Sequence, residues 1–235
     1  GGNEPREAST AARPGCRLGP VSGDESDELP PPGRPQPPER WDPEPPPDSI
    51  FELAEACRQY VLGSLNVELD YTPETLPLVD HYLTMAASTL SDRPELNELT
   101  TRSAGAYFGE VLRRLGPSFW LMPSVDAHDW RVCFETAFMA VNPVAIVWDA
   151  LARSTEHGGP SSEVKLDRDE REAVEHRLAQ LPEVPEDEYW LLSTRHEVLE
   201  IIFDQLRLEM QRSGTDDVRF SAEDYEDFPK PLGEA

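Results

Sequence analysis

The sequence lacks the long apolar segments that mark membrane and exported proteins. No run of apolar residues approaches the roughly 18 needed to cross a membrane as a helix. The first residues also lack the apolar stretch of a signal peptide. We therefore expect neither a membrane span nor a signal peptide.

The familiar catalytic and cofactor motifs are missing too. There is no GxSxG, no phosphate-binding GxxxxGK[ST] and no GxGxxG after a predicted strand. Residues 196–200, HEVLE, begin like the HExxH helix of zinc proteases, but Glu200 stands where the second histidine is needed. Two imidazoles therefore do not face one metal, and we predict no metal site and no cofactor.

Cysteine is scarce, with Cys16, Cys57 and Cys133 as the only three. Their number is odd and no pair has CxxC spacing, so neither a disulfide framework nor a zinc site is indicated. Cys57 and Cys133 lie in apolar patterns and are predicted to be small buried hydrophobic residues, which fits a reducing compartment.

Positive charge is scarce as well. The 21 lysines and arginines face 46 aspartates and glutamates, which gives a formal net charge of −25. This balance argues against direct nucleic-acid binding, because phosphate contacts need clustered lysine and arginine. It favours either a basic protein partner or a role of the charge in solubility or a high-salt habitat. The oligomeric state stays open.

Proline is abundant but unevenly placed. Residues 1–47 hold more than half of the 24 prolines and one aromatic residue, Trp41. Such a segment buries too little apolar surface to offset its chain entropy, so we predict a disordered tail over 1–47. A folded domain is expected over 48–214. Residues 215–235 are predicted to be an acidic tail; the alternative is a short segment docked by its aromatic residues, Phe220, Tyr225 and Phe228.

The segment 99–122 is the centre of the predicted domain. Its apolar residues recur at helical spacing, and small residues such as Gly105 and Gly109 indicate the close approach of a neighbouring helix or a ligand. Gly116 and Pro117 are expected to end this helix, and residues 118–122 to form a strand. The apolar stripe consists of Ala104, Tyr107, Phe108, Val111, Leu112 and Leu115.

Capping and periodicity predict the other elements. A strand over 130–141 is expected to pair with 118–122. The predicted fold class is therefore α+β, a helix-rich single domain with a small antiparallel sheet. The other predicted helices cover 50–63 (capping box Ser49/Glu52), 72–90 (cap Thr72 before Pro73), 143–153 (cap Asn142), 167–181 (cap Asp167) and 194–213 (capping box Thr194/Glu197).

Three stretches together resemble a known family. Residues 69–76 (LDYTPETL), residues 104–111 (AGAYFGEV) and Asn142-Pro143 are similar to a pattern in small uncharacterised bacterial domains. The resemblance extends over about residues 67–153. It implies a bacterial, cytoplasmic origin, and it implies no activity, ligand or catalytic residue.

Glu110 is the polar residue of most interest, because it lies within the most apolar helix beside glycines. A carboxylate buried there would suit a general base. The alternative is a surface ion pair with Arg113 or Arg114, at i+3 and i+4. With Tyr107, Gly109 and Arg113, Glu110 also forms our candidate binding set.

Asp80 and His81 are a second, weaker candidate pair, since an acid can tune a neighbouring histidine; adjacent helical residues nevertheless point about 100° apart. The five histidines, His81, His128, His157, His176 and His196, are expected to be exposed or associated with caps. Trp120, Trp130 and Trp148 are expected to supply core area rather than a ligand platform.

These observations lead to two hypotheses. The first is a non-enzymatic protein-interaction domain, of the immunity or adaptor kind, that docks a basic partner through charge. The alternative is a hydrolase or transferase of unrecognised type, with Glu110 or Asp80 as the base.

Overall fold

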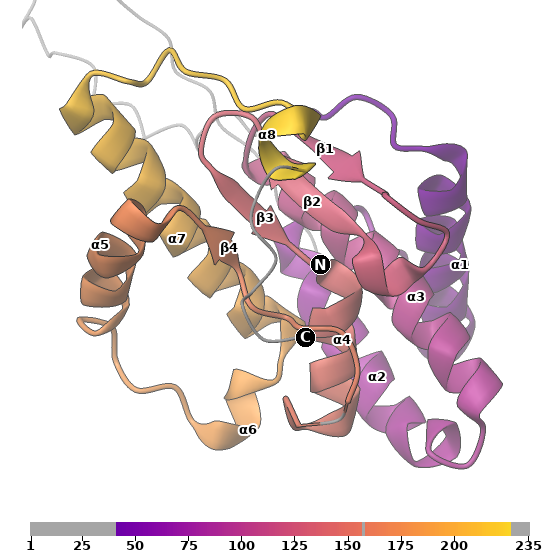
Figure 1. Cartoon of the computed structure of the whole chain (residues 1–235). Helices are drawn as coiled ribbons and strands as arrows, with labels where there is room; N and C mark the ends of the chain where they lie inside the picture. The colour runs from indigo at the N-terminus through magenta and orange to yellow at the C-terminus, as the bar shows by residue number, and fades with distance from the viewer. Residues whose placement is uncertain (1–40, 157, 227–235) are drawn as a thin grey trace, which may run out of the picture. The chain divides into compact units, whose positions relative to one another are not determined.

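The structure, a computed structural model, describes residues 41–156 and 158–226 (Figure 1). The fold is α+β and helix-rich, with a small antiparallel sheet, as predicted. Cys16, His157, Phe228 and the predicted tail up to residue 40 lie outside the described residues. The helices are α1 (Asp48–Leu65), α2 (Leu76–Leu90), α3 (Pro94–Leu112), α4 (Pro143–Ala152), α5 (Arg168–Leu178), α6 (Glu186–Tyr189), α7 (Leu192–Ser213) and α8 (Ala222–Glu226), with 3-10 helices η1 (Pro73–Thr75), η2 (Arg113–Leu115) and η3 (Ala127–Asp129).

The sheet has four strands in the order β1-β2-β3-β4, and each neighbouring pair is antiparallel. The predicted pairing of 118–122 with the following strand is confirmed. The single strand predicted over 130–141 is wrong, because a turn at residues 135–138 divides it into β2 and β3. The strands are β1 (Ser118–Leu121), β2 (Arg131–Phe134), β3 (Met139–Val141) and β4 (Lys165–Leu166).

The two faces of the sheet have different cover. One face belongs to the main core, where the ring of Phe134 packs against Phe203 of α7 at 4.9 Å between centroids. The other face is covered by α8, drawn in yellow in Figure 1, whose Tyr225 packs on Phe119 and Phe138. The Tyr225 hydroxyl donates to the carbonyl of Phe134 at 2.6 Å. The C-terminal segment up to residue 226 is therefore docked, and the preferred prediction of a loose tail is wrong there.

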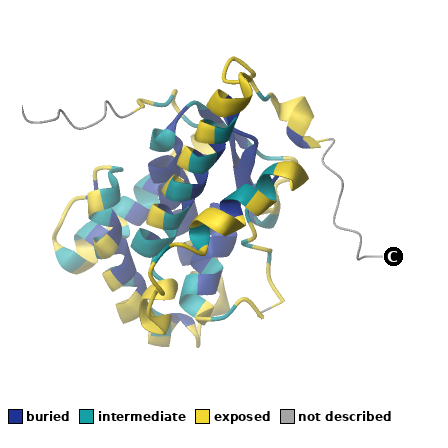
Figure 2. Cartoon of the chain, turned by 90° about the vertical axis from the view of Figure 1, so that its left-hand side faces the viewer, coloured by how far each residue is buried: buried dark blue, intermediate teal, exposed yellow. Residues whose placement is uncertain are grey.

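Helix α3 lies at the centre of the packing, and residues 103–112 are all buried (Figure 2). A Cβ atom added at Gly105 would lie 2.8 Å from the Cα of Val144, so α4 crosses α3 at close range. A Cβ at Gly109 would lie 2.3 Å from the Trp120 ring. The predicted close approach at these glycines is confirmed, and the neighbours are a helix and an indole. The φ of Gly116 is 173°, which any residue can adopt, so its backbone conformation does not require glycine. Glycine is needed there for space, because an added Cβ atom would lie 2.8 Å from the Phe203 ring.

The predicted caps are confirmed at two of five helices. Asn142 accepts a hydrogen bond from the N–H of Ala145 at the start of α4, and Asp167 caps α5. The capping boxes at Ser49 and Thr194 are wrong, because α1 begins at Asp48 without a side-chain cap and α7 begins at Leu192. Thr72 precedes the 3-10 helix η1, but its side chain makes no capping hydrogen bond, so the cap predicted there is wrong. Among the residues that the structure describes, no helix combines the length and the apolarity needed to cross a membrane.

Candidate functional site

Glu110 is buried, and its carboxylate is fully engaged. It accepts hydrogen bonds from Trp120 Nε1 at 2.7 Å and from Arg113 at 3.0 Å. The side chains of Arg113 and Glu110 are 4% and 6% exposed. The predicted i,i+3 ion pair therefore exists, but its expected place on the surface is wrong. The arrangement joins α3 to β1 and leaves this carboxylate out of contact with solvent.

Asp80 is buried and caps α7. One carboxylate oxygen accepts the N–H of Leu192 at 2.6 Å, and the other accepts the N–H and hydroxyl of Ser193 at 3.1 and 2.8 Å. Burial raises the pKa of Asp80, although these hydrogen bonds oppose the shift. His81 is exposed, so the structure does not bring the two side chains together.

The other members of the candidate binding set are also inside the protein. Tyr107 is fully buried, and its hydroxyl accepts the N–H of Tyr71 at 3.0 Å. Gly109 lies against the Trp120 ring, and Arg113 also donates to the carbonyl of Glu44 at 2.9 Å. These residues hold elements together, and none of them is displayed on a surface that a partner reaches.

The three stretches that carry the family resemblance meet at α3. In the first stretch, Tyr71 has a φ of 63°, a strained conformation for tyrosine. The hydroxyl of Tyr107, in the second stretch, accepts a hydrogen bond from the backbone N–H of Tyr71. In the third, Pro143 and Val144 pack against Gly109 and Gly105. These residues therefore pack elements of the fold against one another.

Several histidine and tryptophan predictions need correction. His196 is 2% exposed and lies in the core, so the prediction of an exposed or capping histidine is wrong there. Trp120 and Trp130 are buried as predicted, but Trp148 is half-buried and lines a cleft. Within residues 41–156 and 158–226, no group of three or more metal-binding side chains comes together.

Two adjoining clefts form the best candidate site. They lie on either side of the loop between β1 and β2, and both are lined by Arg102 and Val125. Val125 is 94% exposed, far more than any other large apolar residue among those described. The apolar cleft, of about 690 Å³, is also lined by Ser49, Glu52, Leu53, Met122, Pro123, Ser124 and Trp130. The polar cleft, of about 480 Å³, is also lined by Pro94, Asn97, Glu98, Asp126, Ala127, His128 and Trp148.

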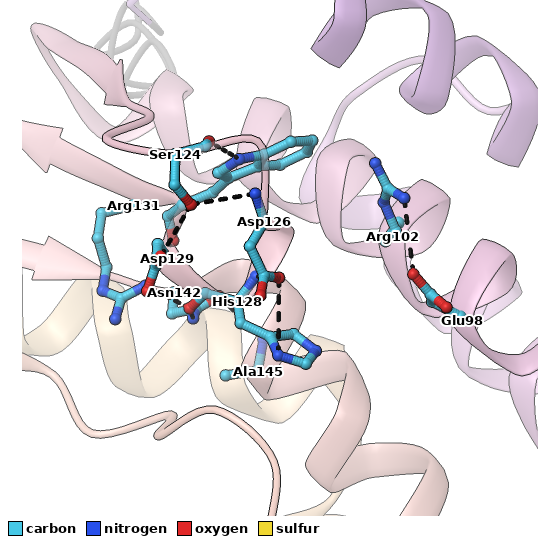
Figure 3. Close-up of polar contacts among 10 residues, drawn as sticks. Glu98, Arg102, Ser124, Asp126, His128, Asp129, Arg131, Asn142 and Ala145 are labelled. Carbon is cyan, nitrogen blue, oxygen red and sulfur yellow. Dashed lines mark hydrogen bonds and ion pairs between the residues drawn. The ribbon is translucent and has the colours of Figure 1, made fainter.

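Hydrogen bonds hold the β1–β2 loop in one conformation (Figure 3). The Ser124 hydroxyl donates to Asp129 at 2.8 Å, and its carbonyl accepts Trp130 Nε1 at 3.1 Å. Asp126 caps the next turn by accepting the N–H of His128 at 3.0 Å. Asn142 donates to the carbonyl of His128 at 2.7 Å, which ties the loop to the start of α4. Val125 is therefore displayed on a preorganised loop.

The walls of the clefts are mainly acidic. Glu98 on α3 lies 3.7 Å from Arg102, while Asp126 projects from the loop opposite (Figure 3). Together with Glu52, this makes three carboxylates that line the two clefts, compared with one guanidinium group, that of Arg102. The Arg102 guanidinium also lies over the Trp130 ring, at 5.6 Å from its centroid.

The hydroxyl of Ser124 and the imidazole of His128 have different partners. The Ser124 hydroxyl donates to Asp129, whereas His128 Nδ1 lies 3.7 Å from Asp126. The hydroxyl of Ser124 is therefore bonded to a carboxylate and not to the imidazole, so these side chains do not form a Ser–His pair. The arrangement is suited to binding.

This site is not apparent from the sequence. Residues 123–129 carry only the signal of a polar loop, and the Glu98–Arg102 pair only that of an i,i+4 ion pair on a helix. An exposed valine within a polar loop is the one local sign. Comparison of the chain with protein-family models, curated proteins and solved structures gives no match, so the bacterial origin stays a prediction.

Proposed function

We propose that the protein is a non-enzymatic protein-interaction domain, of the immunity or adaptor kind, that docks a basic protein at the paired clefts. The observation that carries this proposal is Val125, which is 94% exposed on a loop fixed by hydrogen bonds between two concave surfaces. Leu53, Met122 and Pro123 line the adjoining cleft, so Val125 belongs to a contiguous apolar surface of the kind that marks contact sites.

Charge supports a basic partner. The whole chain carries a formal net charge of −25. Around the clefts, too, acidic side chains outnumber the single arginine. A positively charged protein would be attracted over a distance of about 10 Å at 0.1 M salt, and more weakly at higher salt. Association is therefore expected to be fast and sensitive to salt.

The proposed setting is the cytoplasm of a bacterial cell. Cys57 and Cys133 support a reducing compartment, because both are buried and unpaired thiols. Burial raises the pKa of each thiol to about 12, so both stay protonated and inert.

The test is capture from a lysate by three forms of the immobilised full chain. Wild type is compared with Val125→Asp and with Val184→Asp, a control that places the same charge at an exposed valine of another loop. A basic protein kept by wild type and the control, lost by Val125→Asp and shed at higher salt supports the proposal. Equal capture by all three forms, or no capture, overturns it.

A further inference from the structure

We infer that the paired clefts bind their partner through an extended peptide segment, which places an apolar side chain in the apolar cleft and an arginine or lysine in the polar cleft. This inference rests on the proposed function, because it names the part of a protein partner that occupies the site. Three observations carry it, one from each cleft and one from two polar atoms beside the polar cleft.

The apolar cleft is built to take a hydrophobic side chain. Leu53, Met122 and Pro123 line it, and the Trp130 ring forms part of its wall. Trp130 is 3% exposed, its indole N–H is bonded to the carbonyl of Ser124, and the Arg102 guanidinium lies over its ring. The apolar surface of the cleft is therefore supplied mainly by Leu53, Met122 and Pro123. A volume of about 690 Å³ lies within the usual range for ligand sites.

The polar cleft is built to take a cation. Glu98 and Asp126 approach it from α3 and from the loop, and Trp148 supplies an aromatic surface from α4. Arg102 lies 3.7 Å from Glu98 in the same cleft, and His128 lies 3.7 Å from Asp126, so two carboxylates face one guanidinium and one imidazole. Carboxylates and an indole are the groups that bind guanidinium and ammonium ions best. The same carboxylates would repel a phosphate, which argues against a nucleotide or a nucleic acid as the occupant.

Two buried polar atoms beside the polar cleft indicate recognition of a main chain. Asn97 Oδ1 and Arg102 Nε are both covered by neighbouring atoms, and neither has a hydrogen-bond partner in the described part of the chain. A bound peptide group would reach them once the two side chains rotate toward the cleft. One is an acceptor and the other a donor, and both residues line the polar cleft. A peptide group supplies the matching N–H and C=O, whereas a lone side-chain cation supplies only donors.

The first step of the test identifies binders. A phage-displayed library of random linear 12-residue peptides is selected on the full wild-type chain, after depletion on the Val125→Asp variant. We expect the enriched peptides to combine a basic with an apolar residue. Each enriched peptide is then synthesised with a fluorescent label, and its affinity is measured by anisotropy.

The second step tests charge recognition with a matched control. The Glu98→Gln/Asp126→Asn variant removes two cleft charges, and asparagine at 126 keeps the cap on His128. We expect roughly fivefold weaker binding of the basic peptide, as for two exposed ion pairs, and unchanged binding of its neutral analogue. Asp216→Asn/Glu223→Gln makes the same change in net charge at exposed positions away from the clefts and is expected to leave binding unchanged.

The third step tests main-chain recognition by N-methylating the peptide one residue at a time. This changes no protein residue, so loss of folding cannot explain the result. Methylation at one position is expected to weaken binding at least tenfold, because a buried acceptor is left without a partner. Equal melting temperatures, measured by circular dichroism, are required of every protein variant.

These experiments distinguish a failure of the peptide inference from a failure of the proposed function. Enriched peptides without basic residues, or equal binding by both double variants, overturn the assignment of the polar cleft. An absence of enriched peptides, together with a basic protein that Val125→Asp fails to capture, overturns the extended segment and leaves the proposed function standing. Failure of both experiments overturns both proposals.

Discussion

The carboxylate of Asp80 on α2 accepts the backbone N–H of Leu192 at 2.6 Å, across 112 positions in the chain. Its other oxygen accepts the N–H and the hydroxyl of Ser193. The first N–H groups of a helix have no partner within the helix, and here a side chain of another helix supplies one. Asp80 thereby fixes the start of α7 on α2.

We predict that Asp80→Ala lowers the free energy of unfolding by about 2 kcal/mol, the upper range for loss of an N-cap. Asp80→Asn is expected to cost less, since its amide oxygen still accepts one of the N–H groups. Urea unfolding followed by circular dichroism measures both. The control is Asp167→Ala, which removes the exposed cap of α5 and is expected to cost about 0.5–1 kcal/mol. An unchanged midpoint for Asp80→Ala would refute the capping role.

A second prediction concerns the buried pair of Glu110 and Arg113. Glu110→Ala leaves a guanidinium that is 4% exposed without its carboxylate, and we expect a loss of about 3–5 kcal/mol. A Glu110→Met/Arg113→Met double variant is expected to recover most of that loss, because no uncompensated charge remains. Thermal and urea unfolding provide the measurements. If Glu110→Ala instead kept its full stability, the structural assignment of Glu110 would fail and a catalytic role would return to consideration.

The third prediction compares two glycines whose replacement by alanine is expected to have opposite effects on stability. Gly109→Ala places a methyl group 2.3 Å from the Trp120 ring, so it is expected to destabilise the protein by about 1–3 kcal/mol. Gly63 lies in α1 and is exposed, and a Cβ atom added there would have no neighbour within 4 Å. Gly63→Ala is therefore expected to stabilise by about 0.5–1 kcal/mol. Melting temperatures that shift in the same direction would contradict the packing described for α3.

The fourth prediction is a pH dependence at Glu170. Burial, and then the charges of Asp167, Glu209 and Asp169, raise the pKa of Glu170 above its ordinary value. The folded state therefore binds a proton more readily than the unfolded state, and stability falls as pH rises from the ordinary pKa through the raised one. We expect Glu170→Gln to stabilise the protein at pH 7 and to have little effect below about pH 4.

The matched control for this prediction is Glu172→Gln, which makes the same change in charge at an exposed position of α5. The comparison is made by urea unfolding at a series of pH values. A stabilisation that is the same for both variants would show a general effect of net charge, and the specific environment of Glu170 would then not be responsible.

Local sequence patterns predict where helices lie, but they do not predict which elements pack around a helix. The periodicity of α3 and the caps Asn142 and Asp167 depend on residues within one or two turns, and these predictions are confirmed. The expected surface position of the Glu110 ion pair is wrong. We expected only the face of α3 that carries the apolar stripe to be buried. In the structure α1, α4 and the sheet surround α3, so its polar face is buried too.

The clefts show the same limit more strongly. Their walls come from residues as far apart as Ser49 and Trp148, on α1, α3, α4 and the β1–β2 loop. No stretch of sequence contains more than one wall. The docked C-terminal segment is similar, because the partners of Tyr225 lie about 90 positions earlier in the chain.

By itself, the sequence determined the acidic charge, the main helices and the α+β class, since composition, capping and periodicity act between near neighbours. Only the tertiary structure decided that the carboxylates of Glu110 and Asp80 are buried and hydrogen-bonded, that Tyr225 docks on the sheet and that Val125 lies between two clefts. Burial and concave surfaces arise from side chains distant in sequence, and they exist only once the chain has folded.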